Sequence, residues 1–260
     1  MVSEYWTEDK LLDGRVIFLQ PRHGYRVAID PVLLAAAVPA RSGDCILDLG
    51  SGTGAASLCL AARLQDVHVT GLELQRELVD LARKSADYSG LGGQVSFEPG
   101  DILTPPYSVT GAKFDHVMAN PPYMAKGAGF PPSDPQKALA YVEGPAVLED
   151  WLELAQRSIK TGGTVTFIHR SDRQEELMAG FSSDKWCVTL LPLWSKEQER
   201  AAKRVIIHAQ HGAGMAAVIA PSLVLHDVDG RYSEKANAVL KDCASINLQD
   251  LARGQGARLF

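Results

Sequence analysis

A strand-like run that ends in a glycine-rich turn constrains the fold of this chain most strongly. Cys45–Leu49 is apolar apart from Asp48, and residues 50–54 then read Gly-Ser-Gly-Thr-Gly. The segment 55–64 is rich in Ala and Leu, which favour a helix. Strand, glycine turn and helix in this order let the backbone approach a nucleotide closely. The spacing is not the Gly-x-Gly-x-x-Gly of dinucleotide-binding proteins, and the Lys-Ser/Thr of a phosphate-binding loop is missing. We therefore do not expect a bound pyrophosphate.

Two further strand-like runs end beside acidic residues. Residues 67–72 lead to Glu73, at the separation from the glycine turn where an acid grips a ribose diol in nucleotide-binding folds. Residues 95–98 are followed by Gly100 and Asp101. Three strands with acidic or glycine-rich tips indicate the carboxyl edge of a parallel sheet, which is where such folds bind ligands.

A rigid tetrapeptide, Asn120-Pro121-Pro122-Tyr123, follows another apolar stretch. Proline donates no hydrogen bond and fixes its own φ, so the Asn120 amide oxygen and the Pro121 carbonyl form a stiff pair of acceptors. Such a pair suits a planar NH₂ group, and Tyr123 adds an aromatic face for stacking. Taken by itself, the tetrapeptide is also compatible with an ordinary proline-rich loop after a strand.

The ordered set of motifs resembles the class I S-adenosylmethionine-dependent methyltransferases over about residues 43–210. The resemblance rests on Asp48-x-Gly50-x-Gly52-x-Gly54, Glu73, Asp101 and Asn120–Tyr123. The tetrapeptide resembles the branch that methylates adenine or guanine amino groups and glutamine amides. The fold implied is α/β: a Rossmann-like, seven-stranded, mostly parallel sheet with helices on both faces.

The resemblance also implies roles for individual residues. Asn120, Pro121, Pro122 and Tyr123 would be catalytic, with Asn120 also near the cofactor. Glu73 would hold the ribose hydroxyls, Asp101 would accept from the adenine amino group, and Asp48 would order the glycine loop or meet the methionine end. The full implied cofactor site is Asp48, Gly50, Ser51, Gly52, Gly54, Glu73, Leu74, Asp101, Ile102 and Asn120.

Three stretches resemble the bacterial valine-tRNA adenine N6-methyltransferases within that branch. They are Tyr25–Leu34, Lys203–Ile207 and Tyr232–Glu234. The first departs from the family in having Ala28-Ile29 where Gly-Thr is common. A tRNA adenine is the substrate that this resemblance implies.

The net charge of −5 opposes nonspecific binding to nucleic acid unless the positive charge is localised. Arg22, His23 and Arg26 form a cluster beside the first of these stretches, and Lys126 follows the tetrapeptide. We predict that these four residues contact the substrate. The run 196–204 is also basic but contains acidic residues, and is equally compatible with a solvated surface.

Composition favours a cytoplasmic enzyme. No stretch approaches the length of roughly 18 apolar residues that crosses a membrane, and the N-terminus lacks a signal-like pattern. The four cysteines are scattered, which suits free thiols. His208 and His211 do not form a metal site by their spacing, because residues three apart on a strand point to opposite faces. The sequence therefore predicts no metal and no membrane partner, and leaves the oligomeric state open.

The organisation we expect is one methyltransferase domain over residues 1–260. It comprises an N-terminal hairpin-and-helix extension (1–42), the Rossmann-like core (43–220) and a C-terminal tail (221–260). The hairpin turns at Asp13-Gly14, and Asp30 is the N-cap of the next helix. The other expectations are helices over 76–88 and 146–160, loops over 105–110 and 124–144, strands over 164–169, 188–193 and 205–210, and a helix stop at Gly162-Gly163.

Three functions compete at this stage. The first is an RNA adenine N6-methyltransferase, with tRNA as the expected RNA. The second is a protein glutamine methyltransferase acting on a release factor, although only about 40 residues precede the core that begins at residue 43 and those enzymes carry a longer helical N-terminal domain. The third is a catalytically silent module that binds S-adenosylmethionine or RNA, which the intact Asn120 and Tyr123 oppose. A small-molecule O-methyltransferase has less support still, because nothing in the sequence resembles a metal or catalytic-base site that would activate a hydroxyl group.

Overall fold

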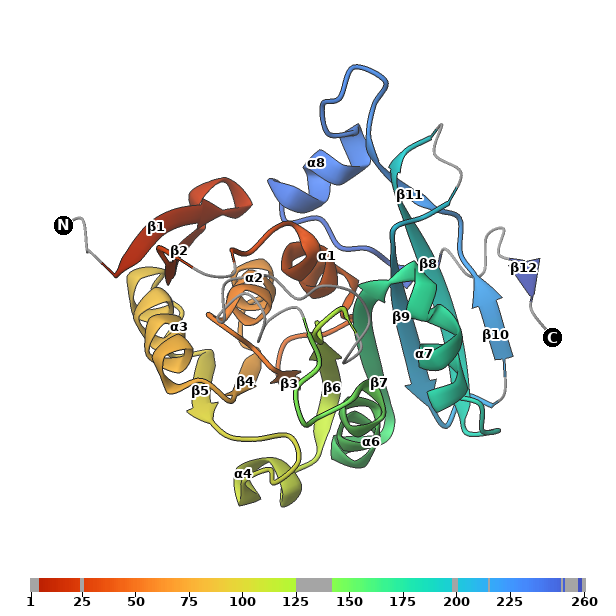
Figure 1. Ribbon diagram of the computed structural model, residues 1–260, viewed down its shortest axis with the longest axis horizontal. Coiled ribbons are helices and arrows are strands. Elements are labelled where there is room, and N and C mark those ends of the chain that lie inside the picture. The colour runs from red at the N-terminus through yellow and green to blue at the C-terminus, as the bar shows by residue number, and fades with distance from the viewer. Residues whose placement is uncertain are drawn as a thin grey trace.

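The computed structural model describes residues 5–23, 26–124, 142–197, 201–214, 216–248, 250 and 257–258. Its centre is a sheet in which five neighbouring strands run parallel, in the spatial order β5-β4-β3-β6-β7 (Figure 1). These strands are β3 (Cys45–Leu49), β4 (His68–Glu73), β5 (Val95–Pro99), β6 (Phe114–Ala119) and β7 (Ile159–Arg170). The chain moves outward from β3 to β5 and then returns to β6 beside β3. The carboxyl ends of β3 and β6 therefore flank the crevice where such sheets bind ligands.

Beyond β7 the sheet continues through an antiparallel pair. β9 (Arg204–His211) runs antiparallel to β7, and β8 (Trp186–Lys196) runs antiparallel to β9. Both contain the strands expected over 205–210 and 188–193. Shorter strands, β10 (Ala216–Ile219), β11 (Leu223–His226) and β12 (Ala257–Arg258), complete a ten-stranded sheet within the described residues. The predicted mostly parallel sheet is thus confirmed, with these three strands added to the seven expected.

Helices cover both faces of the sheet, also as predicted. One hydrophobic cluster packs α1 (Asp30–Ala37), α2 (Ala55–Arg63), α3 (Arg76–Tyr88) and α8 (Glu234–Leu240). A second cluster packs α4 (Tyr107–Thr110), α6 (Leu148–Ser158) and α7 (Gln174–Gly180), which follows the short 3₁₀ turn η2 (Ser171–Arg173). Ile46 and Leu47, adjacent on β3, belong to opposite clusters, as the alternation of side chains along a strand requires.

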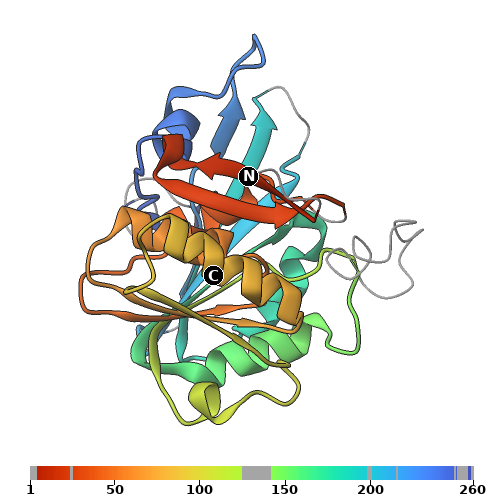
Figure 2. The ribbon, with the colours of Figure 1, turned by 90° about the vertical axis from the view of Figure 1, so that its left-hand side faces the viewer.

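The N-terminal extension begins with the predicted hairpin. β1 (Trp6–Leu11) pairs antiparallel with β2 (Val16–Pro21) through the tight turn η1 (Leu12–Gly14), in which Asp13 and Gly14 both have positive φ. The hairpin lies across α3 (Figure 2), where the backbone N–H of Leu19 donates to Ser85 Oγ at 2.9 Å. This contact fixes the hairpin beside the carboxyl edge of the sheet.

Several local predictions were wrong. Asp30 is the first residue of α1 and not its N-cap, because its carboxylate is drawn to side chains of other elements. The expected loop 105–110 contains the short helix α4. Gly162 and Gly163 lie inside β7, where the register with β6 shifts, and α6 already ends at Ser158.

Other expectations fall partly outside the described residues. Of the long loop predicted over 124–144, residues 125–141 are not described. The predicted tail contains β11, α8 and β12. Within the part of the chain that is described, none of the helices combines the length and the apolar character needed to cross a membrane.

A buried histidine in the sheet predicts how stability depends on pH. His208 is 3 % exposed, and its Nδ1 lies 3.0 Å from Thr166 Oγ1. Burial, followed by the nearby His116, lowers the pKa of His208 from 6.5 to about 4. Between pH 6.5 and about 4, the His208 imidazole is protonated in the unfolded chain but not in the folded protein. The free energy of unfolding therefore falls as the pH drops.

We expect the wild type to lose about 2 kcal/mol of stability relative to a His208→Gln variant between pH 7.5 and 5, since one pKa unit corresponds to about 1.4 kcal/mol. Urea unfolding at both pH values measures this difference. His68→Gln, at an exposed residue of β4, is the control and should retain the wild-type pH dependence. Equal pH dependence in the wild type and His208→Gln would contradict the assignment.

Candidate active site

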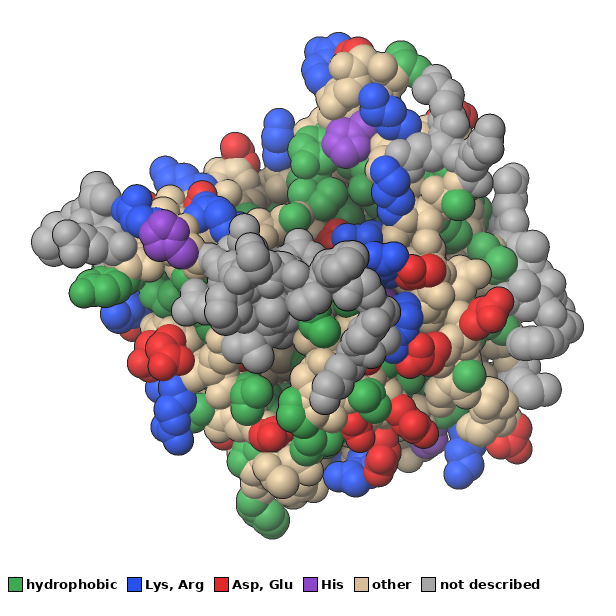
Figure 3. Space-filling view, in the orientation of Figure 1, with side chains coloured by type: hydrophobic (Ala, Val, Ile, Leu, Met, Phe, Trp, Pro, Cys, Tyr) green, Lys and Arg blue, Asp and Glu red, His purple; other side chains and the backbone are tan. Residues whose placement is uncertain are grey.

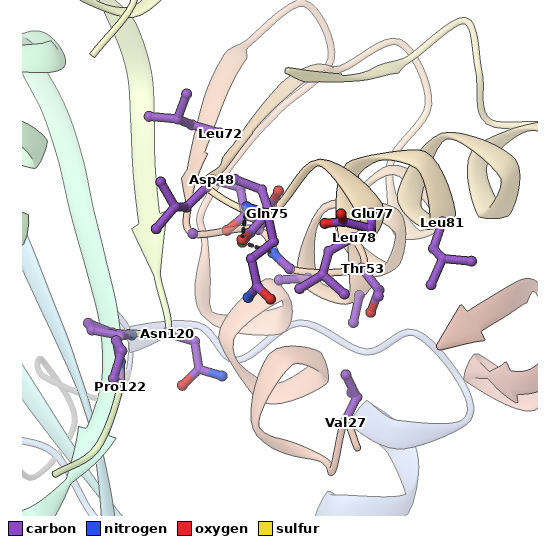
Figure 4. A pocket seen from close by; sticks show the side chains of 18 of the residues that line it. Val27, Asp48, Thr53, Leu72, Gln75, Glu77, Leu78, Leu81, Asn120 and Pro122 are labelled. Carbon is purple, nitrogen blue, oxygen red and sulfur yellow. Dashed lines mark hydrogen bonds between the residues drawn. The ribbon is translucent and has the colours of Figure 1, made fainter. Parts of the chain in front are cut away.

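A cavity of about 890 Å³ opens at the carboxyl edge of the sheet. Its wall is formed by the glycine turn after β3, the ends of β4 and β5, the tetrapeptide after β6, and residues of the N-terminal extension such as Val27 (Figure 4). The structure thus brings together most of the predicted site. The predicted residues in the wall are His23, Asp48, Gly50, Ser51, Gly52, Glu73, Leu74, Asp101, Ile102, Asn120, Pro121, Pro122 and Tyr123.

The glycine turn has a backbone that other residues would strain. Gly50 has a φ of +63°, and a Cβ added there would lie 2.4 Å from the Trp151 ring. Gly52 also has a positive φ, but a Cβ there would meet no atom of the described residues within 4 Å. Gly54 precedes α2 and packs against Phe97 rather than lining the cavity. Side chains of the protein therefore pack against the turn at Gly50 and Gly54, whereas Gly52 leaves room in the cavity.

Glu73 joins the ends of two strands. Its Oε2 accepts from the Gly52 N–H at 2.8 Å, and its Oε1 accepts from the Gln75 N–H at 2.8 Å. The side chain is 7 % exposed, and burial raises its pKa against the opposing effect of these backbone donors. Each carboxylate oxygen has more than one acceptor site, so both retain capacity for a ligand hydroxyl.

The buried Asp48 stabilises the glycine turn and the start of the helix that follows it. It is 2 % exposed and accepts a hydrogen bond from Ser57 Oγ at 2.6 Å, in the first turns of α2. Burial raises the pKa of Asp48 to about 7. Of the two roles left open for this residue, the geometry favours ordering the turn and the helix that follows it.

Two further polar groups of the cavity wall, Asp101 and Ser51, can form additional hydrogen bonds. Asp101 Oδ1 accepts from the Leu103 N–H at 2.9 Å, which leaves its second oxygen for other donors. Ser51 Oγ is buried and has no hydrogen-bond partner among the described residues. Because buried polar atoms rarely remain unpaired, Ser51 is suited to a ligand that completes its hydrogen bonding.

The first residue of the tetrapeptide, Asn120, has a hydrogen-bond acceptor that the described residues leave unused. Asn120 Oδ1 is buried and, among the described residues, has no donor. Asn120 and Pro122 lie together at the end of β6, across the cavity from Leu78 and Leu81 of α3 (Figure 4). The Pro122 carbonyl accepts from His169 Nε2 at 3.2 Å, so the backbone of the loop is tied to β7.

His169 is held in its neutral form. Burial, and then the charge of Arg173, lower its pKa to about 4. Because a carbonyl can only accept, the Nε2 of this neutral imidazole carries the proton, and Nδ1 is buried without a partner among the described residues. The sequence does not single out His169 as a site residue, because it lies within a predicted strand, over 164–169.

Tyr123 is held by residues from distant parts of the chain. Its hydroxyl donates to Asp30 Oδ2 at 2.5 Å, and the Arg204 guanidinium carbon lies 4.4 Å from the centre of its ring. The ring meets that of His169 edge-on, with the centroids 5.4 Å apart. Asp30 and Arg204 were not predicted as site residues, although both lie in stretches that carried the family resemblance.

The predicted substrate cluster is only partly assembled. Arg22, His23 and Arg26 are all exposed, but Arg26 forms an ion pair with Asp9 at 2.8 Å and also donates to Thr7. Of the three, His23 alone lines the cavity. Lys126 lies outside the described residues. On the face shown in Figure 3, Lys and Arg gather mainly in the upper half and acidic side chains in the lower half.

Trp151 of α6 was not predicted by the sequence reasoning. It is 9 % exposed and lines the cavity, and its Nε1 is buried without a partner in the described part of the chain. The only signal for it is its contact with Gly50, which requires the fold to be known. No group of three or more candidate metal ligands occurs among the residues that the structure describes.

Comparisons with known proteins find methyltransferases. A family profile described as a methyltransferase domain matches residues 40–210. The tRNA1(Val) (adenine(37)-N6)-methyltransferase of Aeromonas hydrophila is 29 % identical over 219 residues, which cover 82 % of this chain and 88 % of that protein. The release factor glutamine methyltransferase of Bacillus cereus is 38 % identical over 79 residues, which cover 30 % of this chain and 27 % of that protein.

Solved structures share the fold. A predicted O-methyltransferase from Agrobacterium tumefaciens superposes with a TM-score of 0.69 at 22 % identity, over 84 % of this chain and 98 % of that one. The precorrin-6y C5,15-methyltransferase of Geobacter metallireducens gives 0.53 at 11 % identity, over 75 % and 94 %. The fold and the site thus define an S-adenosylmethionine-dependent methyltransferase. The chain belongs to the methyltransferase-domain family.

The residues present fit S-adenosylmethionine. The turn at Gly52 is open, Glu73 and Asp101 offer acceptors, and Ser51 Oγ lacks a partner among the described residues. These groups line one cavity together with the tetrapeptide. Glu73 and Asp101 would hold the nucleoside part, and the turn at 50–52 would pass close to the rest of the cofactor.

We expect Glu73→Ala and Asp101→Ala each to weaken binding of S-adenosylmethionine by about 1–3 kcal/mol, because polar groups of the ligand lose their partners. Isothermal titration calorimetry measures the affinity, with the exposed Glu153→Ala on α6 as the control. Asp101→Ala is the cleaner of the two, since Glu73 also holds two backbone N–H groups. Unchanged affinity in both variants would remove these residues from the cofactor site.

Proposed function

We propose that this chain transfers a methyl group from S-adenosylmethionine to the exocyclic amino nitrogen of an adenine in tRNA, namely the adenine beside the anticodon of a valine tRNA. The observation that carries the proposal is the buried Asn120 Oδ1, which accepts no hydrogen bond from the described residues and belongs to the wall of the cofactor cavity. A free acceptor next to a stiff proline carbonyl is suited to a planar NH₂ group.

The Asn-Pro-Pro-Tyr residues would orient the target nitrogen. When bound, S-adenosylmethionine supplies an activated methyl group. Asn120 Oδ1 and the Pro121 carbonyl would accept the two N–H hydrogens of the amino group, which favours a pyramidal nitrogen with a localised lone pair. The amino nitrogen becomes strongly acidic only after it gains a fourth substituent, so a strong base is not required. Orientation alone supplies much of the rate enhancement in such reactions.

The target base would have to lie outside an RNA duplex to enter the cavity. A duplex hides the amino group, so an adenine in a loop or a flipped-out adenine is the form that the site accepts. Tyr123 would stack on its plane. The position of His23 on the cavity wall, and the gathering of Lys and Arg mainly in the upper half of the face in Figure 3, support an RNA partner despite the acidic total charge.

The relatives favour RNA over a protein amide. The tRNA-modifying relative aligns over most of both chains, whereas the glutamine-modifying relative aligns over less than a third of either. The second substrate class is kept as an outcome of the test below. The four free cysteines are consistent with the cytoplasmic location that a tRNA substrate requires.

Asn120→Ala should abolish most methyl transfer and leave cofactor affinity nearly intact, because the amide is proposed to contact the target nitrogen. Single-turnover rates with labelled cofactor measure the first effect and calorimetry the second. Asn237→Ala, on α8, serves as the matched control. A variant that keeps most of its turnover would reduce the tetrapeptide to a rigid loop.

The substrate class is tested by offering two acceptors to the purified enzyme. The RNA is total tRNA from a strain in which the gene for this chain is deleted. We expect the labelled methyl group of the cofactor to enter this tRNA and to be recovered as N6-methyladenosine. A release factor, incubated in parallel, should stay unlabelled. Label in the release factor and none in the tRNA would replace this proposal with the glutamine alternative.

A further inference from the structure

His169 contacts the tetrapeptide at two points. It lies one residue before the end of β7, and its Nε2 donates to the Pro122 carbonyl at 3.2 Å. Its ring meets the Tyr123 ring edge-on, with the centroids 5.4 Å apart and the planes at 75°. Because β6 and β7 are parallel neighbours, the tetrapeptide after β6 lies beside the end of β7. One side chain of the sheet therefore contacts both the backbone and the aromatic ring of the loop.

The hydrogen bond restrains the freedom that the loop still has. Each proline ring fixes its own φ, so the backbone through Pro121 and Pro122 turns mainly about ψ. The Pro122 carbonyl moves with the ψ of that residue, and the hydrogen bond from His169 restrains this angle. The Pro121 carbonyl, which is proposed to accept from the target amino group, lies one peptide unit away. The position of that acceptor relative to the sheet thus depends on His169.

The burial of His169 has a cost that simple packing does not explain. Its side chain is 0 % exposed, and its Nδ1 has no hydrogen-bond partner among the described residues. Burial, and then the charge of Arg173, lower the pKa of the ring, so Nδ1 stays an unprotonated acceptor. A buried acceptor without a partner loses its hydration, and an apolar side chain of similar size would avoid that loss. What an apolar side chain could not supply is the donor at Nε2.

We propose that His169 is a positioning residue for methyl transfer. By donating from Nε2 to the Pro122 carbonyl, it holds the tetrapeptide so that Asn120 Oδ1 and the Pro121 carbonyl meet the target amino group together. His169 is not among the residues that line the cavity, and it acts through the loop. The inference rests on the proposed function for the identity of the methyl acceptor, whereas the hydrogen bond to Pro122 does not.

The first test moves the donor along the side chain. His169→Gln keeps an N–H donor near the position of Nε2, whereas the shorter His169→Asn carries its amide nearer the position of Nδ1. Single-turnover rates at saturating cofactor and tRNA are measured for both variants, and calorimetry gives their affinity for S-adenosylmethionine. The matched controls are His208→Gln and His208→Asn, because His208 is buried in the same sheet and does not line the cavity.

We expect His169→Asn to slow the single-turnover step by about 10- to 100-fold, the effect of a small misplacement of the reacting groups. His169→Gln should stay within about threefold of the wild-type rate, because its donor still reaches the Pro122 carbonyl. Both variants should bind S-adenosylmethionine within about twofold of the wild type. A rate of His169→Asn equal to that of the His208 controls would overturn the proposal, and so would equal losses in the two His169 variants.

A second test reads the hydrogen bond without any substrate. Nitrogen-15 NMR of wild-type protein labelled in its histidine rings distinguishes the two neutral tautomers, and the signals lost in His169→Gln assign His169. At about pH 7 we expect the tautomer protonated at Nε2, because it is the neutral form that can donate to the Pro122 carbonyl. The tautomer protonated at Nδ1 would overturn the proposal even if the Asn variant did not fold.

Failure of the proposed function is recognised separately. It appears as a wild-type protein that transfers no label to tRNA, whereas failure of this inference appears as the opposite tautomer or as unaffected rates in the His169 variants. If the label enters the release factor instead, the same variants are measured on that protein. Its glutamine amide presents the same planar NH₂ group to Asn120 and Pro121, so the expected rates are unchanged.

Discussion

The site depends most on the hydrogen bonds that the Glu73 carboxylate accepts from two backbone N–H groups. It lies at the end of β4 and binds the backbone N–H of Gly52, in the turn after the neighbouring strand β3. The same carboxylate binds Gln75, so the loops after two adjacent strands form one unit. An acid buried to this degree is tolerated because backbone donors satisfy it, and its remaining acceptor sites would be available to the proposed cofactor. Without this link, the positive-φ glycine turn would lack its partner.

Much of this arrangement could be predicted from the sequence because it depends on local patterns. Strand ends, the glycine turn and the stiff tetrapeptide are each encoded within a few residues, and parallel strands bring their carboxyl ends together. Glu73, Asp101 and Asn120 therefore line the cavity as the sequence suggests. The sequence also predicts the strands that become β8 and β9, over 188–193 and 205–210.

The parts that could not be predicted depend on contacts between distant segments. Asp30 has the local appearance of a helix cap, and Arg204 that of a surface charge, until Tyr123 is placed between them. Trp151 enters the site only because Gly50 leaves room for its ring. Arg26 was expected to be available to substrate, but it forms an ion pair with Asp9 on β1. The contact of Trp151 with Gly50 and the ion pair of Arg26 with Asp9 cannot be inferred from the spacing of these residues in the sequence.

The most direct measurement is mass spectrometry of tRNA nucleosides from cells that lack this chain. We expect N6-methyladenosine to disappear from one tRNA and to return when the wild-type protein is supplied. An Asn120→Ala protein, supplied at the same level, should not restore it. An unchanged N6-methyladenosine content in the tRNA of the deletion strain would contradict the central claim that the site methylates a tRNA adenine.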